Sequence, residues 1–321
     1  MPTCNETNIS RTIFLLEGFP GLEAVGPWIS IPFCCMYVMS ILGNGLILLV
    51  IKTRKTLHQP MYLFLCMLSV TDLGLSASTL PTVLSVFLFN TREIDIDLCL
   101  VQLFFIHTFS NIESAVLLAM AFDRFVAICH PLRYASILTS ARIGNIGLAT
   151  IIRACGLHIP TVLLLKRLPY SRIQPLSYSY CLHPDVMKVA CADTTPNNFF
   201  GLFTVLSTLG LDSVLIILSY VMILKTVLSF TSWRERLKAL NTCISHICVT
   251  LLFYIPLVSL TMIHRFMKNA FPLSQILSTY LHLLLPPVLN PIVYSIKTKE
   301  IRKQITKVVQ SYSTKRFQLG H

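Results

Sequence analysis

Long stretches of apolar residues follow one another along the whole chain, separated by short polar segments. We place seven of them at residues 28–51, 60–87, 98–129, 141–165, 199–228, 239–263 and 274–296. A helix of about 20 apolar residues spans a hydrocarbon core of about 30 Å. Strands of a membrane barrel would alternate apolar and polar residues, whereas a run such as Val214–Leu218 does not alternate. The pattern therefore predicts an all-α membrane protein, a bundle of seven transmembrane helices.

The composition supports a membrane protein and argues against a nucleic-acid partner. Hydrophobic residues make up 54% of the chain and charged residues only 12%, against about 25% charged residues in soluble domains. The net charge of +12 comes from Lys and Arg in short loops and in residues 297–321. It does not form a basic stripe interleaved with aromatic residues, the pattern typical of nucleic-acid binding.

The distribution of Lys and Arg predicts how the chain crosses the membrane. The loops after the first, third and fifth apolar stretches, together with residues 297–321, carry more of these cations than the other loops. By the positive-inside rule, the tail is cytoplasmic and residues 1–27 are extracellular. Asn5 and Asn8 both lie in sequons, which are glycosylated only on the lumenal side. Residues 1–27 lack a basic start followed by an apolar core, so we expect no cleavable signal peptide.

The tail predicts a short amphipathic helix. Ile301, Ile305, Val308 and Val309 share one helical face, with cations on the other. Such a helix suits the surface of an anionic inner leaflet. A frayed tail is the alternative.

Ionisable residues inside the apolar stretches are costly and usually functional. At 1.5 Å per residue, Asp72 lies roughly 18 Å into the second stretch and Glu113 roughly 16 Å from Arg124, so the two depths are similar. With Asn44 and Asn290 they predict a polar core that could hold a cation such as sodium. A protonated, hydrogen-bonded pair of carboxyls is the alternative. Arg153 and Asp212 are also buried in apolar stretches, and the sequence assigns them no role.

Several motifs occur in a fixed order. They are Gly43-Asn44, Leu57-His58-Gln59-Pro60-Met61-Tyr62, Met120-Ala121-Phe122-Asp123-Arg124-Phe125-Val126-Ala127-Ile128-Cys129, Ser219-Tyr220, Lys238-Ala239-Leu240-Asn241-Thr242-Cys243 and Pro287-Val288-Leu289-Asn290-Pro291-Ile292-Val293-Tyr294. Together they resemble the olfactory receptors, a branch of the rhodopsin-like G-protein-coupled receptors. Glu113, the stretch 185–191 and His264-Arg265-Phe266 are similar to the fish-like class I group. That resemblance implies a plasma-membrane receptor for hydrophilic odorants, carboxylic acids among them.

The resemblance also assigns roles at the two ends of the bundle. It implies a disulfide between Cys99 and Cys181, with free thiols as the alternative. Tyr254, beside Pro256, occupies the place of the rotameric trigger, and Asn290, Pro291 and Tyr294 relay the change. The residues implied to engage a stimulatory G protein, which raises cyclic AMP, are Asp123, Arg124 and Lys238.

This chain departs from the family pattern at three positions. The tyrosines usual on both sides of the Asp-Arg pair are Phe122 and Phe125 here, so two hydroxyls are missing beside the coupling site. Ser171 stands where a loop cysteine is common, so Cys191 lacks its usual local partner and a second loop disulfide is in doubt.

Three residues are candidates for binding an acidic odorant. Arg265 caps the outer end of the sixth stretch, Thr261 lies one turn deeper, and His107 lies about 12 Å below Cys99. A guanidinium fork matches a carboxylate with two hydrogen bonds. We therefore expect Arg265 to bind the acid group, with Thr261 and His107 adding hydrogen bonds. The alternatives are an arginine at lipid headgroups and an ordinary buried histidine.

Other function classes lack their signatures. The seventh stretch has no lysine for a Schiff base before Lys297, so a light receptor is excluded. The sequence shows no paired broken helices of a transporter, and no nucleophile–base set or metal motif. We expect no enzyme activity, cofactor or metal. A same-family receptor that senses a metabolite in a non-olfactory tissue stays open as the alternative.

Overall fold

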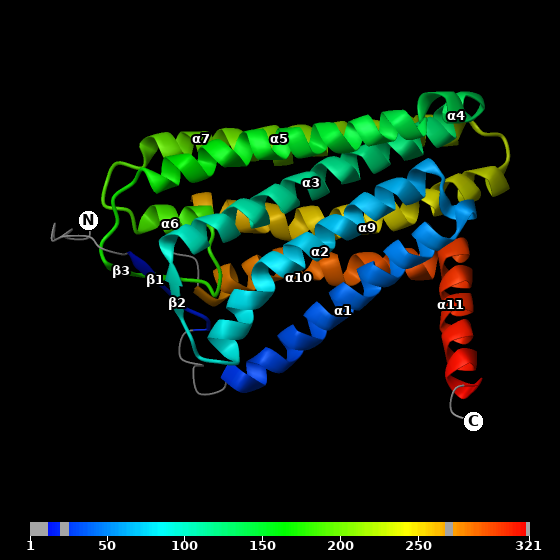
Figure 1. Ribbon diagram of the computed structural model, residues 1–321. Coiled ribbons are helices and arrows are strands. Elements are labelled where there is room, and N and C mark those ends of the chain that lie inside the picture. Colours follow the sequence, from blue (N-terminus) through cyan, green and yellow to red (C-terminus); the bar gives the residue numbers. More distant parts are fainter. Residues whose placement is uncertain (1–11, 20–25, 267–271, 319–321) are drawn as a thin grey trace.

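The chain forms a bundle of long helices that run side by side (Figure 1). The computed structural model describes residues 12–19, 26–266 and 272–318. Seven spans make up the bundle: α1 (Gly26–Thr53), α2 (Pro60–Phe87), α3 (Ile96–Cys129), α5 (Ser140–Lys166), the continuous α7 (Thr195–Val205), η4 (Leu206–Gly210) and α8 (Leu211–Ser229), then α9 (Trp233–Phe266) and α10 (Pro272–Lys297). This confirms the predicted fold class, with boundaries within a few residues of the expected ones except at α9, which begins earlier.

The third span differs from the others in its polarity. By length and apolar composition, six helices of the described chain qualify as membrane spans, and α3 is not among them. It carries Glu113, Asp123 and Arg124, all of which are buried. Because α3 packs against α2, α5, α8 and α9, these three residues face other helices and not the surface.

The outer faces of the bundle are apolar. Large side chains such as Ile152, Leu218 and Leu228 are more than half exposed in the isolated chain. Contact with lipid tails is not unfavourable for such side chains, because the tails are equally apolar. The bundle therefore suits a bilayer on its outside and polar groups on its inside.

Short elements shape the end of the bundle from which α11 (Lys299–Gln318) extends. The turns η2 (Lys55–Leu57), η3 (Pro131–Arg133) and α4 (Tyr134–Ile137) connect the long helices there. α11 leaves the bundle at a steep angle to the other helices (Figure 1), and Ile301 is completely buried against the helical core. The tail therefore contains the predicted helix, which is longer than the sequence pattern indicated.

The opposite end holds a small sheet that the sequence analysis did not predict. β1 (Ile13–Leu16) pairs antiparallel with β2 (Glu93–Asp95) and parallel with β3 (Ile173–Leu176). The short helix α6 (His183–Lys188) lies at the same end (Figure 1). A disulfide joins Cys99 at the start of α3 to Cys181, the pairing that the resemblance implied. These links fasten the loop between α5 and α7 over the helices.

Candidate functional site

A cavity of about 250 Å³ lies among α3, α5, α6, α9 and the α7–η4 segment. Its lining combines polar side chains with apolar ones such as Leu257 and Leu260. The described polar lining residues are His107, Ser110, Asn111, Ser114, His158, Thr161, His183, Lys188, Asn198, Thr204, Thr208 and Thr261. A small pocket with a few converging polar groups in an apolar wall is the usual form of a ligand site.

The lining of this cavity contains two neighbouring imidazoles. His107 on α3 and His158 on α5 stack with their ring centroids 5.6 Å apart. Nε2 of His107 and both ring nitrogens of His158 are buried and make no hydrogen bond within the described residues. Asn111, one turn along α3, is also buried with no partner for its amide nitrogen or oxygen. The sequence analysis found His107 but not its neighbours.

The three predicted ligand-binding residues are only partly described. His107 and Thr261 line the same cavity, and the Thr261 hydroxyl donates to the carbonyl of Leu257 at 2.8 Å. Arg265 lies in the last turn of α9, and its side chain lies outside the described residues. Lys188 of α6 also lines the cavity, a cation that the sequence analysis did not propose as a ligand contact.

A π-helical turn shapes one wall of the cavity. η4 (Leu206–Gly210) interrupts the fifth span and places Thr208 and Leu209 in the lining. Such single turns rotate the helix that follows and are frequent at functional sites. Immediately after the turn, Asp212 points into the bundle and is completely buried.

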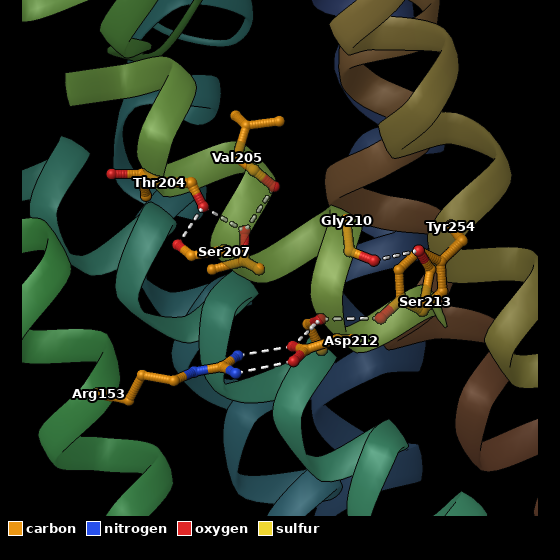
Figure 2. A network of polar contacts seen from close by, with 10 residues as sticks. Arg153, Thr204, Val205, Ser207, Gly210, Asp212, Ser213 and Tyr254 are labelled. Carbon is orange, nitrogen blue, oxygen red and sulfur yellow. Dashed lines mark hydrogen bonds and ion pairs between the residues drawn. The ribbon is translucent and has the colours of Figure 1, made fainter. Parts of the chain in front are cut away.

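Asp212 is the centre of a hydrogen-bonded network that joins four helices. Figure 2 shows Arg153 extending from α5 toward Asp212 on α8, and its two terminal nitrogens donate to the carboxylate oxygens at 2.7 and 2.6 Å. The Ser114 hydroxyl on α3 donates to the same carboxylate at 2.7 Å. Ser114 also contacts the hydroxyl of Tyr254 on α9 at 2.9 Å. This network gives Arg153 and Asp212 a place that their sequence positions did not reveal.

A second buried acidic centre lies between α2, α3 and α10. The amide nitrogen of Asn290 donates to the two Asp72 carboxylate oxygens at 3.3 and 3.1 Å and to Glu113 Oε1 at 3.5 Å. Oε2 of Glu113 and Oδ1 of Asn290 have no partner within the described chain. Asn44 is not hydrogen-bonded to this group, since it donates to the carbonyls of Ser40 and Pro287 at 3.0 and 2.9 Å.

A cavity of about 320 Å³ opens at the α11 end of the bundle. The three predicted coupling residues, Asp123, Arg124 and Lys238, line it together with Tyr294. The Arg124 guanidinium is hydrogen-bonded to Asp123, whose other oxygen accepts from the Tyr134 hydroxyl at 2.7 Å. Tyr134, which follows α3, thus provides a hydroxyl to the Asp123–Arg124 pair, whose neighbours Phe122 and Phe125 have none.

The predicted switch residues lie on α9 and α10. Pro256 is inside α9, two residues after Tyr254, and a proline there removes a backbone hydrogen bond and permits a kink. Pro291 of α10 approaches α1 so closely that a Cβ on Gly43 would lie 2.8 Å from the proline ring. Glycine is therefore required at position 43. The Tyr294 hydroxyl lies 3.9 Å from the Met120 sulfur on α3.

The loop over the cavity is held by several contacts besides its disulfide. Asp185 accepts hydrogen bonds from the backbone nitrogen of Ser177 at 2.6 Å and from its hydroxyl at 3.1 Å. Burial raises the pKa of Asp185 despite these bonds. Cys191 is disulfide-bonded in the structure, although Ser171, which stands in the place of its usual local partner, lies only 3.5 Å from its sulfur. The glycosylation candidates Asn5 and Asn8 lie outside the described residues.

The described residues contain no group of three His, Cys, Asp or Glu that could hold a metal ion. The arrangement can bind a small polar molecule at one end and contact a partner at the other, with buried polar networks between them.

Comparison with known proteins supports a single assignment. A family model described as olfactory receptor matches residues 33–312. The chain is 58% identical to olfactory receptor 51G2 of Homo sapiens over 94% of this chain and 96% of that protein. It is 54% identical to human olfactory receptor 51L1, over 93% of this chain and 95% of the relative.

Proposed function

The chain belongs to the olfactory receptor family of G-protein-coupled receptors, and we propose that it detects small carboxylic-acid odorants and raises cyclic AMP through a stimulatory G protein. Family membership makes it a multi-pass receptor of the plasma membrane that couples odorant binding to a G protein, and not an enzyme. The proposal adds the ligand class, the G-protein type and the orientation.

The cavity among α3, α5, α6 and α9 is the observation that carries the proposal. It is enclosed by the loop that the Cys99–Cys181 disulfide fastens, and Lys188 lines it. Lys188 is exposed at the edge of this cavity, and a cation there favours an anionic ligand because its charge attracts the carboxylate toward the site. Arg265, at the end of α9, supplies a second cation in the proposal, and Thr261 and His107 supply hydrogen bonds.

Signal transfer would run along α9. Ligand contact with the Leu257–Thr261 wall would change the packing of Tyr254, whose hydroxyl contacts Ser114. A kink at Pro256 would let the far end of α9 move outward, a shift between two populations that the ligand biases. Asn290, Pro291 and Tyr294 would carry the same change along α10. The 320 Å³ cavity around Arg124 is the surface that a G-protein α subunit would enter.

The proposal also fixes an orientation in the membrane. The end with the β1–β3 sheet and α6 would be extracellular, with Asn5 and Asn8 glycosylated. The end with Arg124 and α11 would be cytoplasmic. The buried Asp72–Glu113 centre would hold a proton or a sodium ion in the inactive receptor. Expression in the olfactory epithelium or in another tissue separates an odorant receptor from a same-family metabolite receptor.

One experiment tests the ligand class. Cells that express the receptor and an olfactory-type stimulatory G protein are exposed to aliphatic acids, alcohols and aldehydes of matched length, and cyclic AMP is measured. We expect acids to be the strongest agonists. Arg265→Ala should raise the half-maximal acid concentration about tenfold or more, the usual consequence of removing a charged hydrogen-bond donor. Lys188→Ala should raise it less, by about two- to fivefold, because the Lys188 side chain is exposed to solvent. An unchanged acid response in both variants would exclude the acid-binding role.

A second experiment tests the coupling end. Arg124→Ala should abolish cyclic AMP production while surface labelling of intact cells stays at the wild-type level. Lys52→Ala, a cation at the end of α1 that does not line the Arg124 cavity, is the matched control and should signal normally. Full signalling from the Arg124 variant would contradict the role of Arg124.

A further inference from the structure

The cavity has a second polar region, distinct from the Lys188 cation of α6. Five atoms from three residues form it: Nε2 of His107, Nδ1 and Nε2 of His158, and the amide nitrogen and oxygen of Asn111. All five are buried, and none has a hydrogen-bond partner within the described residues. The three residues line the cavity, and only 5% of His158 is exposed. A buried polar atom without a partner is unfavourable unless something in the cavity bonds to it.

The chemistry of these atoms defines what they can bind. A neutral imidazole offers one donor and one acceptor, and a carboxamide offers donors on nitrogen and an acceptor on oxygen. A carboxylate can only accept and an ammonium can only donate, so each would leave some of these atoms unpaired. A hydroxyl donates and accepts at once. It therefore matches the mixed set.

We propose that His158, with His107 and Asn111, forms a subsite for a hydroxyl group of the odorant. This inference rests on the proposed function, because it assumes that the odorant occupies this cavity. The ligand class becomes a short aliphatic acid that carries a hydroxyl at the end of its chain opposite the carboxylate. Without ligand, water molecules can occupy the same positions, since the region is polar and large enough for them.

Two features favour His158 as the residue that sets the preference. Both of its ring nitrogens are unpaired, whereas the hydroxyl of Thr161, on the next turn of α5, donates to the Leu157 carbonyl at 2.9 Å. Stacking against His107 at 5.6 Å holds the ring in place. A group that is already oriented loses little entropy when the ligand binds.

The test compares ligands that differ only in the terminal group. Octanoic acid and 7-hydroxyheptanoic acid have equal numbers of heavy atoms, as do the neutral pair octan-1-ol and heptane-1,7-diol. Cyclic AMP is measured for the wild type, His158→Phe, His158→Asn and Thr161→Val, each with surface labelling. We expect the hydroxy acid to act at a concentration about tenfold lower than the plain acid on the wild type, the effect of one or two hydrogen bonds to buried groups.

The variants separate a binding role from a structural one. His158→Phe should abolish the preference for the hydroxylated ligand while the response to octanoic acid persists. His158→Asn, which keeps a donor and an acceptor, should restore part of the preference, and Thr161→Val should leave it unchanged. Equal potency of the two acids on the wild type, or an undiminished preference in His158→Phe, would overturn the subsite.

The neutral pair distinguishes this inference from the proposed function. If neither acid activates the receptor but the diol is more potent than the alcohol, the acid class is wrong and the subsite stands. If the acids activate without any hydroxyl preference, the acid class stands and the subsite is wrong. Silence toward all four compounds from a receptor that reaches the surface would overturn both.

Discussion

Two buried acidic centres in the middle of this bundle differ in how their negative charge is compensated. Asp212 is completely buried and accepts two hydrogen bonds from Arg153 and one from Ser114. Asp72 and Glu113 are equally buried, yet within the described chain their side chains share only the amide of Asn290 as a donor. One centre contains its own countercharge, and the other does not.

The difference indicates separate roles for the two centres. A carboxylate paired by a bidentate arginine is neutralised in place, and such a pair fixes the relative position of the helices that carry it. Two neighbouring carboxyls without a cation must take up a proton or an ion, because like charges cannot both persist in a low dielectric. The Asp212 centre is therefore suited to hold the bundle together, and the Asp72 centre to respond to its surroundings.

The largest expected effect comes from breaking the ion pair. Arg153→Ala leaves the Asp212 charge buried without its partner, which costs about 3 kcal/mol, the lower end of the usual range because the Arg153 side chain is 30% exposed. We expect a large loss of receptor at the cell surface and a lower unfolding temperature in detergent. Surface labelling and thermal unfolding of the purified receptor measure these effects.

The matched control removes both charges. Arg153→Met combined with Asp212→Leu replaces the pair by apolar groups, a change that is often neutral for stability. Surface abundance should then recover, although Ser114 loses an acceptor. A double variant as poorly expressed as Arg153→Ala would mean that the positions act through packing and not through charge.

A smaller effect is expected at the other centre. Asp72→Asn and Glu113→Gln each remove one of the two neighbouring carboxyls and keep the shape, so stability should change by less than about 1 kcal/mol. The response to sodium should change instead: agonist potency in wild-type cells should fall as sodium replaces an inert cation, and this dependence should vanish in both variants. Wild-type sodium dependence in both would remove the ion-binding role.

The smallest expected effect concerns the link between the ion pair and α9. Tyr254→Phe removes one hydroxyl and its contact with Ser114, while Ser114 keeps its bond to Asp212. One hydrogen bond contributes about 1 kcal/mol, so agonist potency should shift about fivefold with normal surface abundance. Tyr37→Phe, which removes a buried hydroxyl bonded to Thr79 away from both cavities, shows whether any lost hydroxyl has this effect. A Tyr254 variant with wild-type potency would show that the hydrogen-bonded network around Asp212 does not influence signalling through α9.

The Asp72 centre could be anticipated from sequence because only distance along a helix was needed. A rise of about 1.5 Å per residue put Asp72 and Glu113 at similar depths, and Asn290 joins them in the structure. Arg153 and Asp212 could not be paired in this way. Their contact depends on the rotation of two helices about their axes, and the π-turn at Leu206–Gly210 changes that rotation in a way that hydrophobic pattern does not encode.

The same limit explains which cavity residues were missed. His107 was accessible to prediction through its depth below Cys99, whereas His158 lies on a helix with no comparable reference point. Lys188 belongs to a loop whose path depends on the disulfide and on the sheet of β1, β2 and β3. That sheet joins segments far apart in the chain, each too short to give a periodic signal.

The central claim is that a small molecule in the cavity among α3, α5, α6 and α9 controls the G-protein end of the bundle. Leu260→Trp tests it by filling the cavity from the α9 wall, where Leu260 is buried in the lining. Cyclic AMP is measured over a concentration series of the best acid agonist, with receptor number matched by surface labelling. The account predicts that the response is lost in this variant, and a concentration–response curve identical to that of the wild type would contradict it.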